Sequence, residues 1–216
     1  MLKLIAIASH TTPVNVVKIN EDGDLLFSAS NDKEDTTVCL FYSHSGERIG
    51  SFKCKAAVKS IDVSRDSKFL ITMSSIGDLE IWQVEGGIRI GTMVMDKRRS
   101  RYVQFLTGDK SFMILSSGFA STDPSELHFY SFPKILAALG YKGQVLTKHN
   151  ETIIKDDKYV TNKINLEGKY NIAALGPANK YVYVGTDNKK DNENSVSIVD
   201  MKGKKLVTKV VHSNPI

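Results

Sequence analysis

The chain has little cysteine, proline and tryptophan, and it has no long apolar run. Its 216 residues include two cysteines, five prolines and one tryptophan. Cys39 and Cys54 each lie in or beside a predicted strand, which indicates free, half-buried thiols in a reducing compartment; a disulfide would suit a secreted chain. No segment approaches the roughly 18–20 apolar residues that a membrane-spanning helix requires. These absences argue against a disulfide-rich domain and against a helical membrane protein.

Sequence motifs of the common enzyme classes are also missing. The phosphate-binding loop, the Gly-x-Ser-x-Gly elbow and the His-Glu-x-x-His zinc pattern do not occur. The five histidines are scattered, and no two of them have the spacing of metal ligands. The sequence therefore predicts a protein that is not an enzyme and that has no cofactor, no metal site and no small-molecule substrate.

Charge gives a mild indication of possible partners. The chain has 29 basic and 24 acidic residues, a formal net charge of +5, which permits an acidic partner or RNA but indicates neither. The densest basic run is Lys97, Arg98, Arg99 and Arg101, in a predicted loop between two repeats. Guanidinium groups pair with phosphate and carboxylate groups through two hydrogen bonds, so this loop could contact RNA or an acidic partner. The alternative is a basic loop that only water contacts.

One pattern recurs four times along the chain. Each copy has an apolar run, a polar turn, a second apolar run, a variable loop and a five-residue stretch of a third strand, before an outer strand. The third-strand stretches are residues 39–43, 79–83, 127–131 and 196–200. Four strands in about 40–45 residues are typical of a β-propeller blade. The sequence predicts an all-β chain of about four antiparallel four-stranded blades, a single partial propeller over residues 1–216.

The predicted blades are unequal in length. Their boundaries are residues 9–53, 54–93, 94–164 and 165–211. The third blade is long because residues 133–165 exceed what one outer strand needs, so we expect an excursion there, with a helical turn at 135–139. A polar, charged loop at 187–194 is the other irregular segment.

This pattern resembles the WD-repeat propellers and, within them, the i subunit of eukaryotic translation initiation factor three. The most specific matches are the run from Gly23 to Ser28 and the turn from Gly46 to Gly50. The resemblance is closest over residues 9–60 and continues collinearly to residue 216. It implies that the chain corresponds to the N-terminal part of the family's propeller, about four of its roughly seven blades.

The resemblance implies a structural role for the residues that hold each blade together. Trp82 keeps the tryptophan that ends a repeat, and Asp200 keeps the aspartate. In the first blade, His10 is expected to form a hydrogen bond with Ser28 or Ser30. The residues to which we assign a structural role are His10, Ser28, Tyr42, Trp82, Tyr130, Asp200 and His212.

The resemblance also implies a function. It indicates a non-enzymatic, cytoplasmic scaffold that holds the b and g subunits of the initiation factor and contacts the small ribosomal subunit indirectly, with no membrane contact. The family's partners use later blades heavily, so we carry no binding residue over. The alternative is a WD-repeat adaptor that contacts RNA or an acidic partner through residues 97–101.

An incomplete propeller leaves strand edges open. The outer strand at residues 205–211 pairs within its own blade, and residues 2–8 would complete a later blade. Exposed edges pair readily with other chains. The expectation is that the natural protein is longer, or that the chain is stabilised by a partner or by self-association.

Overall fold

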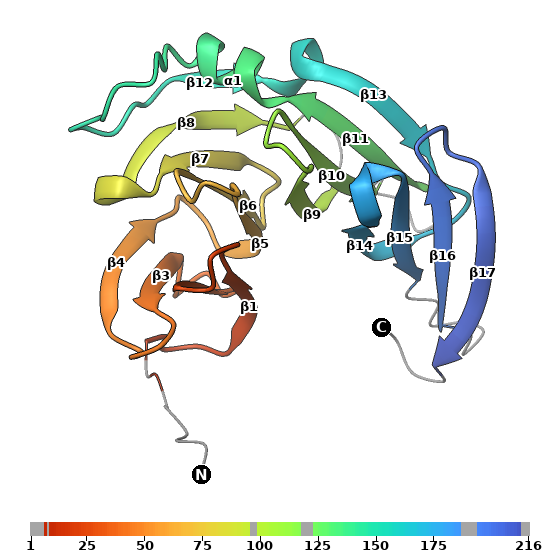
Figure 1. Ribbon diagram of the computed structural model, residues 1–216, viewed down its shortest axis with the longest axis horizontal. Helices are drawn as coiled ribbons and strands as arrows, with labels where there is room; N and C mark the ends of the chain where they lie inside the picture. The colour runs from red at the N-terminus through yellow and green to blue at the C-terminus, as the bar shows by residue number, and fades with distance from the viewer. Residues whose placement is uncertain (1–6, 8, 96–98, 118–122, 187–193, 213–216) are drawn as a thin grey trace. The chain divides into compact units, whose positions relative to one another are not determined.

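A computed structural model describes residues 7, 9–95, 99–117, 123–186 and 194–212. These residues form four antiparallel sheets in two compact units, with two sheets in each unit (Figure 1). The first unit contains the described residues up to Val94 together with Leu136–Ile154, and the second contains the others. The predicted fold class, all-β with four-stranded antiparallel blades, is confirmed.

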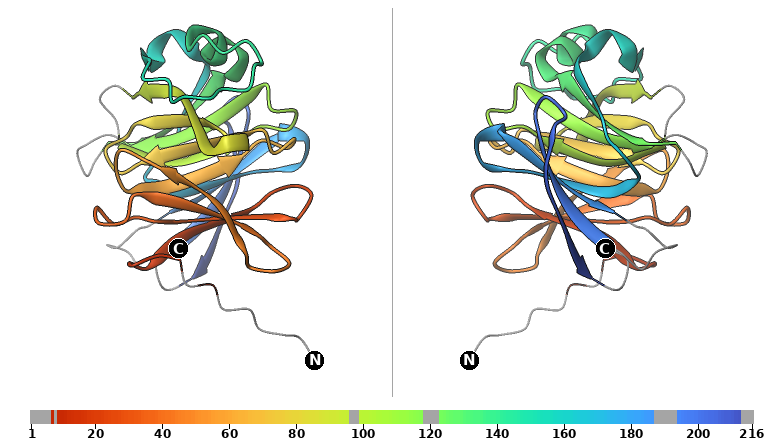
Figure 2. Two further views of the ribbon diagram at one scale, coloured as in Figure 1. Left: turned by 90° about the vertical axis from the view of Figure 1, so that its left-hand side faces the viewer. Right: turned by 90° about the vertical axis from the view of Figure 1, so that its right-hand side faces the viewer.

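The first unit contains the first and second sheets. The first sheet consists of β1 (Val14–Ile19), β2 (Leu25–Ser30), β3 (Thr37–Tyr42) and β4 (Arg48–Lys53). The second consists of β5 (Val58–Val63), β6 (Phe69–Ser74), β7 (Leu79–Gln83) and β8 (Ile88–Val94), with the short helix η1 (Glu85–Gly87) before β8. Neighbouring strands follow chain order in both sheets, because each connection is a short polar turn. Side views show the twist within the sheets (Figure 2).

The core of the first unit lies between its two sheets. Phe27 and Phe52 from the first sheet meet Trp82 from the second, and the Phe52 and Trp82 rings pack edge to face with their centroids 5.7 Å apart. All three side chains are buried. This apolar burial holds the two blades together.

The second unit contains the third and fourth sheets. The third sheet consists of β9 (Arg99–Phe105), β10 (Ser111–Ser117), β11 (Ser125–Ser131) and β13 (Val160–Asn165), with η2 (Asp156–Tyr159) before β13. The fourth consists of β14 (Tyr170–Leu175), β15 (Tyr181–Thr186), β16 (Asn194–Asp200) and β17 (Lys205–His212), with η3 (Pro177–Asn179) before β15. Its core includes Leu115, Phe129, Ile164, Val182 and Val199. Most residues of β10 and β11 are buried on both faces of the third sheet.

The excursion between β11 and β13 contains a helix and an additional strand. The helix α1 (Phe132–Ala138) starts before the helical turn predicted at 135–139. The chain then runs to β12 (Ile153–Lys155), which joins the second sheet as a fifth strand beside β8 (Figure 1). Residues 136–154 therefore pack with the first unit, although they lie within the predicted third blade in sequence.

Candidate partner-binding surfaces

The predicted hydrogen bond between His10 and Ser28 in the first blade is present, and His10 forms a second one with Asp35. His10 Nε2 lies 2.8 Å from Ser28 Oγ, and His10 Nδ1 lies 2.8 Å from Asp35 Oδ2. Because a carboxylate only accepts, Nδ1 carries the hydrogen in this bond. Burial raises the pKa of Asp35, but hydrogen bonds from His10 and from the Thr37 backbone outweigh it and leave the pKa below its ordinary value. The sequence did not predict the hydrogen bond of Asp35, because Asp35 lies in a loop outside the repeating strand pattern.

In the second blade, Trp82 also forms a side-chain hydrogen bond within the blade. Its Nε1 donates a hydrogen bond to Thr72 Oγ1 at 3.2 Å, and Cys54 Sγ lies 3.7 Å from the same oxygen. Cys39 and Cys54 are both free and buried. Burial raises the pKa of both thiols, so neither is a reactive thiolate at neutral pH.

The third blade has a chain of polar side chains on one face of β11. His128 Nε2 lies 2.7 Å from Glu126 Oε2, and Tyr130 donates its hydroxyl hydrogen to Asp156 Oδ2 at 3.1 Å. Burial, followed by the charge of Asp156, raises the pKa of Tyr130 far above its ordinary value. This arrangement ties β11 to η2 and keeps Tyr130 protonated, which is consistent with a structural role.

The remaining residues with a predicted structural role lie in three different settings. Tyr42 is 39% exposed and packs near the His44 ring, so it contributes little to the core. Asp200 Oδ1 accepts hydrogen bonds from the backbone N–H groups of Lys202 and Lys204 and so fixes the turn between β16 and β17. His212 is the last residue of β17, and its side chain lies outside the described residues.

The basic run is divided between two settings. Lys97 and Arg98 lie outside the described residues. Arg99 and Arg101 belong to β9, so the predicted loop 97–101 ends where β9 begins at Arg99. Arg101 is half-buried, and its Nε donates to Ser117 Oγ at 2.9 Å. One N–H group of the Arg101 guanidinium is therefore hydrogen-bonded within the third blade.

The face of the fourth sheet that points away from its core is apolar and exposed. The strand register places Ala174, Tyr183, Ile198 and Val207 in one row across β14, β15, β16 and β17. Val207 is 53% exposed, and Ile172, on the same face two residues before Ala174, is 46% exposed. An exposed apolar row of this kind makes this face a candidate surface for contact with another protein.

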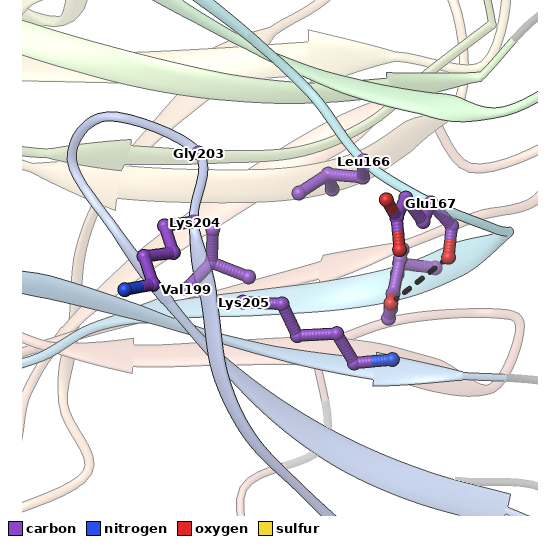
Figure 3. Close-up of a pocket in the computed structure, with 7 residues that line it drawn as sticks. Leu166, Glu167, Val199, Gly203, Lys204 and Lys205 are labelled. Atoms are coloured by element: carbon purple, nitrogen blue, oxygen red, sulfur yellow. Dashed lines mark hydrogen bonds between the residues drawn. The ribbon is translucent and has the colours of Figure 1, made fainter.

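A small cavity lies where the β13–β14 connection meets the β16–β17 turn. Its volume is about 320 Å³, and its lining residues are Leu166, Glu167, Tyr170, Val199, Gly203, Lys204 and Lys205. Figure 3 shows Glu167 and Lys205 on opposite walls. The charged side chains are exposed, and opposite charges face each other, so the cavity favours neither an anion nor a cation.

Two findings concern what the described part of the chain lacks. No group of three or more His, Cys, Asp and Glu side chains there is arranged to hold a metal ion. Among the same residues, no helix has the length and apolar character needed to span a membrane.

Comparison with known proteins supports the predicted resemblance. Eukaryotic translation initiation factor 3 subunit I of Dictyostelium discoideum is 35% identical over 133 residues, which cover 62% of this chain and 39% of the relative. The protein of the same name from Emericella nidulans is 37% identical over 87 residues, 40% of this chain and 25% of the relative. The chain resembles subunit I in sequence, as predicted, and the matches span less than half of each relative's length.

Two further comparisons concern the fold. No family profile matches the chain. A chain of the Kuenenia stuttgartiensis hydrazine synthase structure matches with a TM-score of 0.67, covering 91% of this chain and 48% of that one at 13% identity. At that identity the likeness shows the fold alone.

Proposed function

We propose that this chain is a non-enzymatic scaffold subunit that acts in translation initiation as part of initiation factor 3 in the cytoplasm. The observation that supports it most is the 35% identity to subunit I over 133 residues. The blades supply the physical means, because a sheet held by its own core offers a rigid face and rigid edges to other chains. By the same resemblance, its partners are the b and g subunits, which link it to the small ribosomal subunit.

The exposed face of the fourth sheet is the surface that we assign to a partner subunit. Its apolar row gives a partner area to bury, and the exposed Lys209 on β17, whose register partner is Val196, lies on the same face. Lysines next to an apolar surface favour a segment with both apolar and acidic side chains. The partner segment on this face is therefore expected to be amphipathic and acidic.

Affinity purification of the tagged full chain from the cells that express it tests the proposal. Other initiation factor 3 subunits are expected to co-purify and to sediment with the small ribosomal subunit in a density gradient. The double variant Ile172→Lys/Val207→Lys is expected to lose a partner subunit, because two charges would be buried without partners. Ile76→Lys is the matched control, because Ile76 is 68% exposed and lies in a turn of the first unit. Purification without initiation factor subunits would reject the assignment.

The alternative, direct contact with RNA through residues 97–101, is a separate proposal supported by the charge of that run. Each phosphate contact steepens the dependence of RNA affinity on salt. The triple variant Arg98→Ala/Arg99→Ala/Arg101→Ala is expected to flatten that dependence for ribosomal RNA if the contact exists. A variant lacking Lys202, Lys204 and Lys205 is a charge-matched control. An unchanged salt dependence in the arginine variant rules the contact out.

A further inference from the structure

Residues 140–154, which we call the strap, cover the outer edge of β8 in the first unit. Backbone hydrogen bonds join them to that edge: Asn150 N donates to Arg89 O at 2.8 Å, and Thr92 N donates to Thr152 O at 3.0 Å. Arg89 N, in turn, donates to His149 Nδ1 at 2.9 Å. The edge of β8 therefore receives a strand-like segment from the same chain, in the manner of strand addition by a peptide.

Charge complements these backbone bonds. Arg89 is 7% exposed and contacts two carboxylates, with Glu80 Oε1 3.3 Å from its Nη1 and Glu151 Oε1 bonded to its Nη2. Lys55 Nζ lies 3.5 Å from Glu151 Oε2. The charge of Arg89 lowers the pKa of Glu151, whereas burial, only partly countered by Arg89, raises that of Glu80. Glu80 belongs to the blade itself, and Glu151 is the carboxylate that the strap brings.

The strap also meets an aromatic surface. The His149 ring packs edge to face against Trp82 with the centroids 6.0 Å apart, and the Arg89 guanidinium carbon lies 5.4 Å from the Trp82 ring centroid. Trp82 is fully buried and is the one tryptophan of the chain. The fluorescence of Trp82 therefore reports directly on what occupies this edge.

The strap is held less firmly than the strands that it covers. Each of its residues is exposed or half-buried, and Val145 and Ile153 are 62% and 59% exposed. The buried apolar anchor is Leu139, just before the strap, which packs against Gly91 so closely that a methyl group on Gly91 would overlap its side chain. Segments with few buried apolar contacts open at a lower free energy than a blade core.

We propose that the outer edge of β8, with Arg89 and Lys55 beside it, is a docking site for an extended acidic segment of a partner protein, and that the strap occupies this site until such a segment displaces it. The strap shows the required chemistry: backbone groups for Arg89 and Thr92, a carboxylate for Arg89 and a flat ring for Trp82. This inference concerns the edge alone and holds whichever assembly the chain joins.

A peptide copy of the strap is the probe that tests this site. The peptide contains residues 143–151, and the host is the full chain with the same residues replaced by a glycine–serine stretch of equal length. Binding is followed by Trp82 fluorescence, because the peptide has no tryptophan. The peptide is expected to bind this host at least about tenfold more tightly than the unaltered chain, because the tethered strap competes at high effective concentration.

Charge recognition is tested by changing the peptide. The same peptide with Glu151→Lys is expected to bind the host at least about tenfold more weakly than the original. In hydrogen exchange, the amide of Arg89, which donates to His149 Nδ1, is expected to lose protection in the host and to regain it with the original peptide. A second host, Gly91→Ala, loosens the strap at Leu139 and leaves residues 143–151 intact.

The peptide-binding results of the two hosts decide whether the edge of β8 is a docking site. Binding by both hosts, with loss of affinity for the charge-reversed peptide, supports the docking site. If hosts with unaltered far-UV circular dichroism bind neither peptide, or bind both equally, the proposal is wrong. A host that fails to fold is replaced by the other one. These results do not depend on whether initiation factor subunits co-purify, so the two proposals can fail separately.

Discussion

The outer strand of the second sheet and the outer strand of the fourth sheet differ in what lies beside them. Beside β8 lies the strap, and most side chains of β8 are buried. By contrast, β17 is the last strand of its sheet, and Lys205, Leu206, Val207 and Lys209 are exposed. Proteins protect strand edges either by covering them or by placing lysines on them. In this chain the strap covers the edge of β8 in the first unit, and lysines lie on β17 in the second unit.

Under the two proposals above, the difference predicts two kinds of partner contact. A covered edge becomes available only when its cover leaves, so binding there depends on competition with the strap. Among the described residues nothing covers the edge of β17, so we expect it to be available without competition and its lysines to favour an acidic partner. A scaffold with both edges is expected to hold one partner permanently and to accept another conditionally.

Replacing Arg89 by Met is expected to have the largest effect on the covered edge. It leaves Glu80, 2% exposed, as a buried carboxylate without its cation, which lowers the free energy of unfolding by about 3–5 kcal/mol. Urea unfolding followed by far-UV circular dichroism measures this loss. Adding Glu80→Gln to the variant should recover part of the lost stability. Lys55→Met is the control and should cost less than about 1 kcal/mol, because the Lys55 side chain is 39% exposed. An equally small loss for Arg89→Met would contradict the role of the ion pair.

Replacing Asp35 by Asn is expected to have an intermediate effect that depends on pH. The folded-state pKa of Asp35 is below its ordinary value, so its ionised form stabilises the fold above the unfolded-state pKa of about 3.9. That contribution disappears as the pH falls through the lowered folded-state value. We expect Asp35→Asn to lose about 1–2 kcal/mol near neutral pH and to lack this part of the acid dependence.

The fourth sheet supplies the control for that pH dependence. Thr186 Oγ1 accepts a hydrogen bond from Ser195 N at 2.9 Å, and neither group titrates in this range. Thr186→Val should therefore lose the same stability at acid and at neutral pH. If Asp35→Asn keeps the full acid dependence of the unaltered chain, the contribution of Asp35 is refuted.

Removing the lysines of the uncovered edge should change stability least. Lys205→Val/Lys209→Val is expected to alter the free energy of unfolding by no more than about 0.5 kcal/mol. It should raise the self-association constant at least about tenfold, because the edge loses its protecting charges. Sedimentation velocity measures this change, and Lys158→Val/Lys180→Val, at exposed positions outside the strands, is the control. Equal self-association of both variants would show that the edge lysines have no protective role.

Most of the strand pattern could be predicted because it is local. Alternating apolar residues and polar turns indicated the blades, and the apolar surroundings of Trp82 indicated its burial. The start of β9 at Arg99 was missed because charged residues carry no strand signal. The contact of Arg89 with Glu151 joins residues far apart in the sequence, and the polar strap gave no sign of which sheet it covers.

Lysine cross-linking of the complex purified from cells tests most directly whether the blade surfaces hold partner subunits. Lys204, Lys205 and Lys209 are exposed on β17 and in the turn before it, and Lys209 lies on the face that carries the apolar row, so these lysines are expected to form cross-links to other initiation factor subunits. Lys68 is exposed in a turn of the first unit and serves as the internal reference. If the three lysines of the fourth sheet are cross-linked only within their own chain, the proposed partner surface is contradicted.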